Sequence, residues 1–211
     1  MRIYTIQTVS FYDELLQEGI VCCNTQSWMC LEYRVQYDWM AEQMRKRIGN
    51  PPRPETKYPI WVWQQYISKK NPVPPMSSKD IEEGETEAVM LELEVPDNEV
   101  LLSDFSVWHL PLNHGAVTYK HEDNKLVKEL KDYERQHKDC FRVQDYSPEL
   151  QKKILKTWER VFDLDTCDPN IATAKRRNRS IQGTIWLLRK EWLKTAHIFN
   201  RNSEIKRITF E

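Results

Sequence analysis

The stretch SIQGTIW, residues 180–186, places polar side chains inside a segment whose apolar pattern is that of a buried strand. Gln182 and Thr184 lie two positions apart, so on a regular strand they share one face. Gly183 weakens a strand and often marks a bulge or a close approach. Either the polar face meets solvent, as on an edge strand, or something polar lies against it. We expect Gln182 to contact a ligand, and Gly183 to be small because the ligand or an opposing backbone comes close.

A second set of polar residues lies in the first segment, RIYTIQT, which predicts a short strand over residues 2–8. Thr5 and Gln7 share one face of that strand. They are either ordinary polar positions or part of the same site as Gln182. Because both segments carry polar residues among apolar ones, we expect the strands 2–8 and 180–188 to be neighbours in one central sheet.

The chain contains eight tryptophans, and two of them alternate with apolar residues in PIWVWQQY. Alternation places Trp61 and Trp63 on one face, opposite Ile60 and Val62. Because a buried indole N–H needs a partner, we expect at least one of the two rings to line a pocket. The alternative is that they form a wall of a second small core.

A local cluster of charge stands out from the nearly neutral chain, whose formal net charge is −1. The run KRRNR holds four basic residues just before SIQGTIW: Lys175, Arg176, Arg177 and Arg179. It is either a solvated surface or a patch that attracts the phosphates of NAD or of a nucleic acid.

Several enzyme classes are excluded by the absence of their motifs. The sequence has no nucleophile elbow, Walker loop, dinucleotide fingerprint, HExxH or deaminase zinc signature. Five cysteines (22, 23, 30, 140 and 167) form no CxxC pair, so we expect free thiols, and no metal site is predicted. With no stretch long and apolar enough for a span or a signal peptide, we expect a cytoplasmic protein without membrane association.

The pattern of elements predicts the α+β class. Strands are expected near both ends of the chain, with AVMLELEVP (88–96) the clearest, and helices between them. Ser147 and Pro148 begin the strongest helix, over 147–162, and Ser10 and Gly19 bound an early one. We expect a single domain over residues 1–211, with a central, mostly antiparallel sheet, a cleft and flanking helices.

Long segments resemble an uncharacterised bacterial family, a domain of unknown function. They are YDWMAEQMRKRIG, YPIWVWQQY and LELEVPDNEVLLSDFSVWHLPLN, and the resemblance covers nearly the whole chain. That family implies no activity.

The opening strand, the helix YDELLQEG and the strand IVCC also resemble the opening of DarT-type ADP-ribosyltransferases. SIQGTIW is similar to the late strand on which those enzymes carry their catalytic Glu. The resemblance implies an ADP-ribosyltransferase-like fold and NAD as substrate, with Thr5, Gln7, Trp61 and Trp63 as cofactor-binding residues. It also implies catalytic roles for Gln182 and Thr184, and an RNA, DNA or protein acceptor. A toxin or defence effector, with an antitoxin partner, fits this description.

One position departs from the transferase pattern. Thr184 stands where the catalytic Glu is expected, and a threonine can orient a ribose hydroxyl but cannot stabilise positive charge. Glu92 or Asp104 could supply the carboxylate, although Asp104 also has the position of a turn cap. The second hypothesis is therefore a non-enzymatic nucleic-acid- or partner-binding module, with tryptophans for stacking and KRRNR for phosphates.

Overall fold

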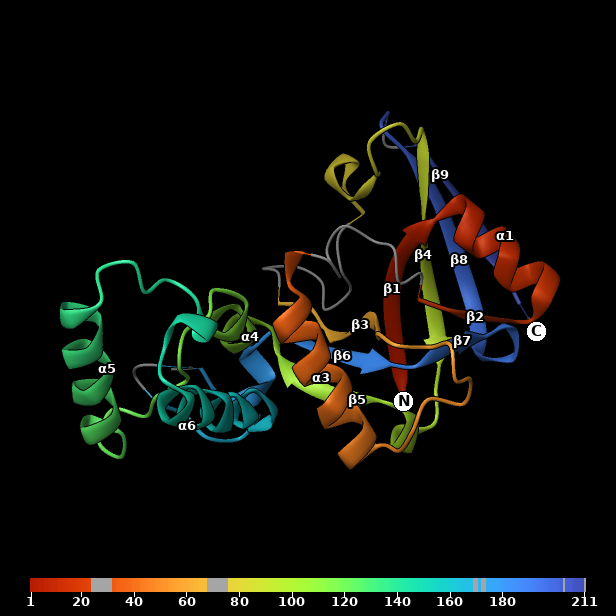
Figure 1. Ribbon diagram of the computed structural model, residues 1–211. Helices are drawn as coiled ribbons and strands as arrows, with labels where there is room; N and C mark the ends of the chain where they lie inside the picture. Colours follow the sequence, from red (N-terminus) through yellow and green to blue (C-terminus); the bar gives the residue numbers. More distant parts are fainter. Residues whose placement is uncertain (24–31, 68–75, 169–170, 172–173, 203, 211) are drawn as a thin grey trace. The chain divides into compact units, whose positions relative to one another are not determined.

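The computed structural model describes residues 1–23, 32–67, 76–168, 171, 174–202 and 204–210 (Figure 1). Contacts divide the chain into two compact units. The first unit combines Met1–Leu102 with Ile181–Glu211, and the second is Ser103–Ser180. The prediction of one domain over 1–211 is not decided by this division, so each unit is described by itself.

A seven-stranded sheet organises the strands, in the order β5-β6-β3-β1-β4-β8-β9. Its strands are β1 (Arg2–Thr8), β3 (Ile60–Gln65), β4 (Glu87–Glu94), β5 (Leu101–Asp104), β6 (Ile181–Ile185), β8 (Leu193–Asn200) and β9 (Ile205–Thr209). The described pairings are antiparallel. The predicted α+β class, with a large antiparallel sheet and flanking helices, is confirmed.

The segment 180–188 is divided between two sheets. β6 ends at Ile185, and β7 (Leu187–Arg189) pairs with β2 (Ile20–Cys22) in a separate two-stranded sheet. β1 and β6 do share the large sheet, as expected, but β3 lies between them. The expectation that they are direct neighbours is therefore wrong.

The helices begin and end close to their sequence signals. They are α1 (Val9–Glu18), α3 (Arg34–Arg47), α4 (Phe105–Leu112), α5 (Asn124–Gln136) and α6 (Pro148–Trp158). Ser147 caps α6 with Pro148 in its first turn, and Gly19 ends α1 in the left-handed conformation, as predicted. The cap of α1 is Thr8 rather than Ser10, because the Thr8 hydroxyl accepts the Phe11 N–H at 3.2 Å.

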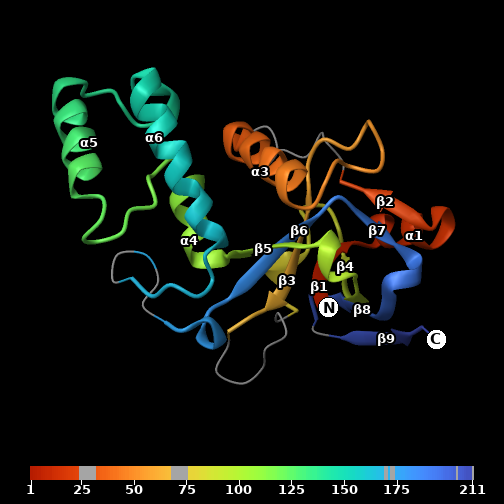
Figure 2. The same cartoon turned by 90° about the horizontal axis from the view of Figure 1, so that it is seen from below.

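The two faces of the large sheet differ in what covers them. One face carries Ile3, Val62, Leu91 and other buried apolar side chains of the main core. The opposite face carries Trp61, against which Tyr37 of α3 packs edge-on at 6.0 Å. Figure 2 shows α3 beside the part of the sheet that contains β3 and β6. We call this second face the α3 face, and it also carries the residues of the candidate site.

Candidate functional site

A single row of polar and aromatic residues crosses the α3 face. Cross-strand partners in an antiparallel sheet point to the same side, so the register of five successive pairings defines the row. From β6 to β9 it reads Gln182, Trp63, Tyr4, Glu92, Thr195 and Thr209. The structure therefore brings Gln182 and Trp63 together, and the row continues with Tyr4 next to Trp63 and Glu92 next to Tyr4.

Gln182 is buried, with 6% of its surface exposed. β6 lies inside the sheet between β5 and β3, so the alternative of a solvent-facing edge strand is wrong. Its side-chain amide nitrogen is buried and has no hydrogen-bond partner among the described residues. An unsatisfied buried donor costs about 1–3 kcal/mol, so this position requires an explanation.

Thr184 is fully buried, and it pairs across the sheet with Trp61. Its hydroxyl donates to the Leu101 carbonyl at 3.5 Å, which is a long hydrogen bond. Because α3 contacts Trp61 through Tyr37, Thr184 lies on the part of the face that the helix approaches. The predicted alternation of Trp61 and Trp63 against Ile60 and Val62 is confirmed, since only the latter two are fully buried.

Gly183 is small for a different reason from the one expected. A Cβ at this position would lie 2.8 Å from Val100 Cγ1, 3.2 Å from Val62 Cγ2 and 3.3 Å from Leu102 Cδ2. Apolar side chains of β3, of β5 and of Val100, which directly precedes β5, occupy the space on the core side of β6. The expectation that a ligand or an opposing backbone comes close is wrong, because the close atoms belong to side chains.

Thr5 and Gln7 point to the opposite side from Gln182. Tyr4 pairs with Trp63, so Thr5, one position later, faces the core. Its hydroxyl donates to the Trp61 carbonyl at 2.9 Å and accepts from Gln7 Nε2 at 2.7 Å. The first bond joins β1 to β3, and the second lies within β1. The structure thus does not bring the two predicted NAD-binding residues of β1 to the face of Gln182.

Glu92 is the carboxylate in the row. Arg2 Nε lies 3.2 Å from its Oε1, and the carboxylate side chain is mostly buried. Burial, followed by the nearby Glu92 charge, raises the pKa of Tyr4, which keeps the phenol protonated. The sequence indicated Glu92 as a possible carboxylate but not its place in the fold, and it did not indicate Tyr4 at all. Only the register between β1, β3 and β4 reveals that the two belong with Gln182.

His197 of β8 also lies on the α3 face, because it pairs with Met90, two positions from Glu92. Burial lowers the pKa of this imidazole, and the charge of Arg207 lowers it further. Its Nδ1 is buried and has no hydrogen-bond partner within the described part of the chain. A neutral imidazole can accept or donate a proton, so His197 adds a further polar group to this face.

The basic run lies in the second unit and divides into two kinds of residue. Lys175, Arg176 and Arg177 are exposed. Arg179 is buried, and its guanidinium donates to Asp104 Oδ2 at 3.4 Å and to the Ala174 carbonyl at 2.6 Å. We therefore remove Arg179 from the predicted phosphate-binding group, since its donors are engaged internally.

Asp104 is a helix cap, which is one of the two roles that the sequence offered for it, the other being a catalytic carboxylate. Its Oδ1 accepts the Val107 N–H at 3.0 Å at the start of α4, and its Oδ2 receives Arg179. With both oxygens engaged and the side chain buried, Asp104 is a structural residue of the second unit. Glu92 remains as the candidate carboxylate.

Among the described residues, no group of three or more His, Cys, Asp or Glu side chains is arranged to hold a metal ion. The described cysteines, at positions 22, 23, 140 and 167, form no disulfide, while Cys30 lies outside the described residues. Within the same described ranges, no helix has both the length and the apolar surface needed to cross a membrane.

Comparison with known sequences gives a family and no activity. The family model described as a domain of unknown function (DUF3841) matches residues 2–194. No curated protein and no solved structure matches the chain.

Proposed function

We propose a function from the premise that this chain belongs to the DUF3841 family, whose function is unknown. Our proposal is an NAD-dependent ADP-ribosyltransferase-like protein whose ligand lies on the α3 face of the large sheet. The observation that carries it is the buried Nε2 of Gln182, beside Trp63, which has no hydrogen-bond partner in the part of the chain that the structure describes. A ligand acceptor atom at this amide would remove the cost of leaving the donor unsatisfied.

The aromatic residues next to Gln182 suit a nucleotide. Trp63 is half-buried and contacts Tyr66 edge-on at 5.1 Å, and Tyr4 is its partner on β1. An indole ring held by neighbours in this way can stack on a nicotinamide or an adenine at low entropic cost. In a bent NAD molecule, this contact would hold the nicotinamide while the ribose approaches the polar groups.

Glu92 supplies the charge that Thr184 lacks. Neighbouring strands lie about 4.8 Å apart, so the backbones of Glu92 and Gln182, three strands apart, are separated by about 14 Å. Trp63 and Tyr4 lie between them in the row, so a ribose would lie over these rings, with Gln182 at one end and Glu92 at the other. The bond between the ribose anomeric carbon and the nicotinamide nitrogen would break, and nicotinamide would leave as a neutral molecule with the bonding electron pair. The Glu92 carboxylate would stabilise the oxocarbenium-like ribose. The acceptor would then attack the anomeric carbon and lose its proton to solvent.

The test is incubation of the protein with labelled NAD plus lysate, RNA or DNA. We expect label on one acceptor class, and at least a hundredfold lower transfer by Glu92→Gln, since one stabilising group in such a site contributes about 10²–10³ in rate. Gln182→Ala should reduce transfer while the protein stays folded. Glu87→Gln, an exposed residue on the same strand, is the matched control and should retain full transfer. The absence of transfer to all three acceptors, together with no NAD binding by calorimetry, would refute the proposal.

A toxin or defence effector is the setting we propose for this activity. Induced expression in a bacterial host should then slow growth, and Glu92→Gln should remove the effect. An antitoxin partner would be recovered as a protein whose coexpression restores growth. Normal growth with wild-type protein at high level would argue against the toxin assignment while leaving the transferase proposal to the labelling assay.

A second candidate is a non-enzymatic binding module. It is favoured by the missing carboxylate at Thr184 and by the exposed side chains of Lys175, Arg176 and Arg177. Binding of single-stranded RNA or DNA, followed by fluorescence anisotropy, should then weaken steeply with salt. Replacing the three basic residues by Gln should reduce both the affinity and the salt dependence. An affinity unaffected by these replacements would exclude this candidate.

A further inference from the structure

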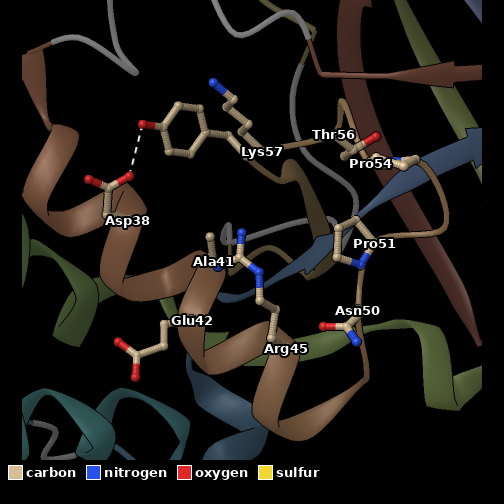
Figure 3. Close-up of a pocket in the computed structure, with 10 residues that line it drawn as sticks. Asp38, Ala41, Glu42, Arg45, Asn50, Pro51, Pro54, Thr56 and Lys57 are labelled. Atoms are coloured by element: carbon tan, nitrogen blue, oxygen red, sulfur yellow. Dashed lines mark hydrogen bonds between the residues drawn. The ribbon is translucent and has the colours of Figure 1, made fainter.

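A hollow of about 710 Å³ lies between α3 and the loop of residues 50–58 (Figure 3). Its volume is within the range of small-molecule sites. Arg45 and Glu42 come from the helix, and Asn50, Thr56 and Lys57 come from the loop. None of these residues belongs to the row that contains Gln182. We propose that this hollow binds a phosphate monoester on a nucleotide-sized body.

The charge available in the hollow is positive. Arg45 and Lys57 line it, and neither forms an ion pair within the described residues. The two acidic lining residues are engaged: Asp38 Oδ1 accepts the Tyr58 hydroxyl at 2.9 Å, and Glu42 forms an ion pair with Lys46. Glu42 is balanced by Lys46, so Arg45 and Lys57 outnumber the one remaining lining carboxylate, Asp38, and the excess of positive charge favours an anionic ligand.

Arg45 is held in place by aromatic packing. Its guanidinium carbon lies 5.7 Å from the ring centroid of Trp186, and the Trp186 indole N–H donates to the Gly49 carbonyl at 2.9 Å. Figure 3 shows the Arg45 side chain in the middle of the hollow, between Ala41 of the helix and Pro51 of the loop. A planar guanidinium positioned before binding loses less entropy when it meets a phosphate.

Thr56 supplies a second, independent observation that favours a ligand in the hollow. It lines the hollow with only 2% of its surface exposed, and its hydroxyl has no hydrogen-bond partner among the described residues. A phosphate oxygen would accept this hydroxyl, and the Asn50 amide could donate as well. Pro51 and Pro54 limit the freedom of the loop that carries these groups.

The test uses calorimetry on the intact protein with adenosine monophosphate, inorganic phosphate and adenosine as probes. We expect adenosine monophosphate to bind tightest, phosphate more weakly, and adenosine not at all. Arg45→Gln and Lys57→Gln should each weaken binding of the nucleotide about tenfold. Arg53→Gln is the matched control, because Arg53 is an exposed cation of the same loop that does not line the hollow. The affinity of this variant for adenosine monophosphate should stay within twofold of the wild-type value.

Thr56→Val keeps the shape of the side chain and removes its hydroxyl. We expect weaker nucleotide binding at an unchanged melting temperature. Equal binding of adenosine, no nucleotide binding at millimolar concentration, or full affinity in the Arg45→Gln/Lys57→Gln double variant would overturn the proposal. Because these measurements follow binding alone, they stand whether or not the protein transfers ADP-ribose.

Discussion

Asp104 and Arg179, 75 positions apart in the sequence, form a buried ion pair at 3.4 Å. Their side chains are 1% and 4% exposed. The two residues stand at opposite ends of the second unit, Ser103–Ser180, and the Phe105 N–H donates to the Ser180 carbonyl at 3.1 Å beside them. The pair therefore ties together the point where the chain enters this unit and the point where it leaves.

Breaking this pair should destabilise the second unit strongly. Arg179→Met leaves the Asp104 charge buried without its partner, a change that costs about 3–5 kcal/mol in comparable sites. Arg177→Met, at an exposed position of the same basic run, should change stability by less than about 0.5 kcal/mol. Urea unfolding followed by tryptophan fluorescence measures both. The double variant Arg179→Met/Asp104→Leu should recover part of the loss, and equal midpoints for all variants would contradict the role of the pair.

Replacing Gly183 by Ala should destabilise the sheet although a methyl group is small. The new Cβ would lie 2.8 Å from Val100 Cγ1, and the β-branched valine has little rotamer freedom with which to move away. We expect a loss of about 1–3 kcal/mol, measured by thermal unfolding. In the Gly183→Ala background, Val100→Ala should restore stability, whereas alone it should lower it. A neutral Gly183→Ala variant would show that the strands separate easily here.

Gln182→Met should separate the structural role of this residue from its proposed ligand role. Methionine has nearly the same volume and no donor, so it removes the unsatisfied amide. Stability should be unchanged or rise by about 1 kcal/mol, while NAD binding, measured by calorimetry, should weaken. A large loss of stability would instead mean that the amide has a structural partner that stabilises the fold.

The pH dependence of the second unit should reveal His114. Burial, followed by the charge of Arg142, lowers the pKa of its imidazole, and Nδ1 accepts the Val143 N–H at 3.4 Å. The folded state thus favours the neutral ring. This contribution is present above the ordinary pKa of about 6.5 and is lost as the pH falls through the lower folded value.

His114→Asn tests this, since asparagine tolerates the positive φ of 61° at this position. Between pH 8 and pH 5, the free energy of unfolding of the wild type should fall more than that of the variant. The exposed residue His121 offers the control His121→Asn, which should follow the wild type. Parallel curves for the wild type and His114→Asn would exclude the linkage.

Most elements could be predicted because their signals are local. Ser147 and Pro148 start α6, Gly19 ends α1, and the alternation in PIWVWQQY assigns Trp61 and Trp63 to one face. The residues that share the candidate site were harder to predict from the sequence. Whether Thr5 lies with Gln182 depends on the register of β1 against β3 and of β3 against β6, which joins residues far apart in the chain.

The reason why residue 183 must be glycine likewise could not be predicted from a local sequence pattern. A glycine inside a strand indicates a close neighbour but does not identify it, and the neighbours here come from β3 and from the segment around Val100. Arg179 could not be distinguished from the other basic residues of KRRNR for the same reason. Its partner Asp104 becomes visible only when the ends of the second unit are placed together.

The order of strands has a consequence for the synthesis of the chain. β6 occupies an inner place between β5 and β3, yet it follows both in the sequence and is made after the whole segment 103–180. Until residues 181–185 leave the ribosome, β3 presents an unpaired edge of backbone donors and acceptors, beside the apolar side chains of Ile60 and Val62. A nascent chain stalled near residue 180 would thus be an aggregation-prone intermediate that chaperones bind. Truncation of the chain at that point should yield insoluble protein.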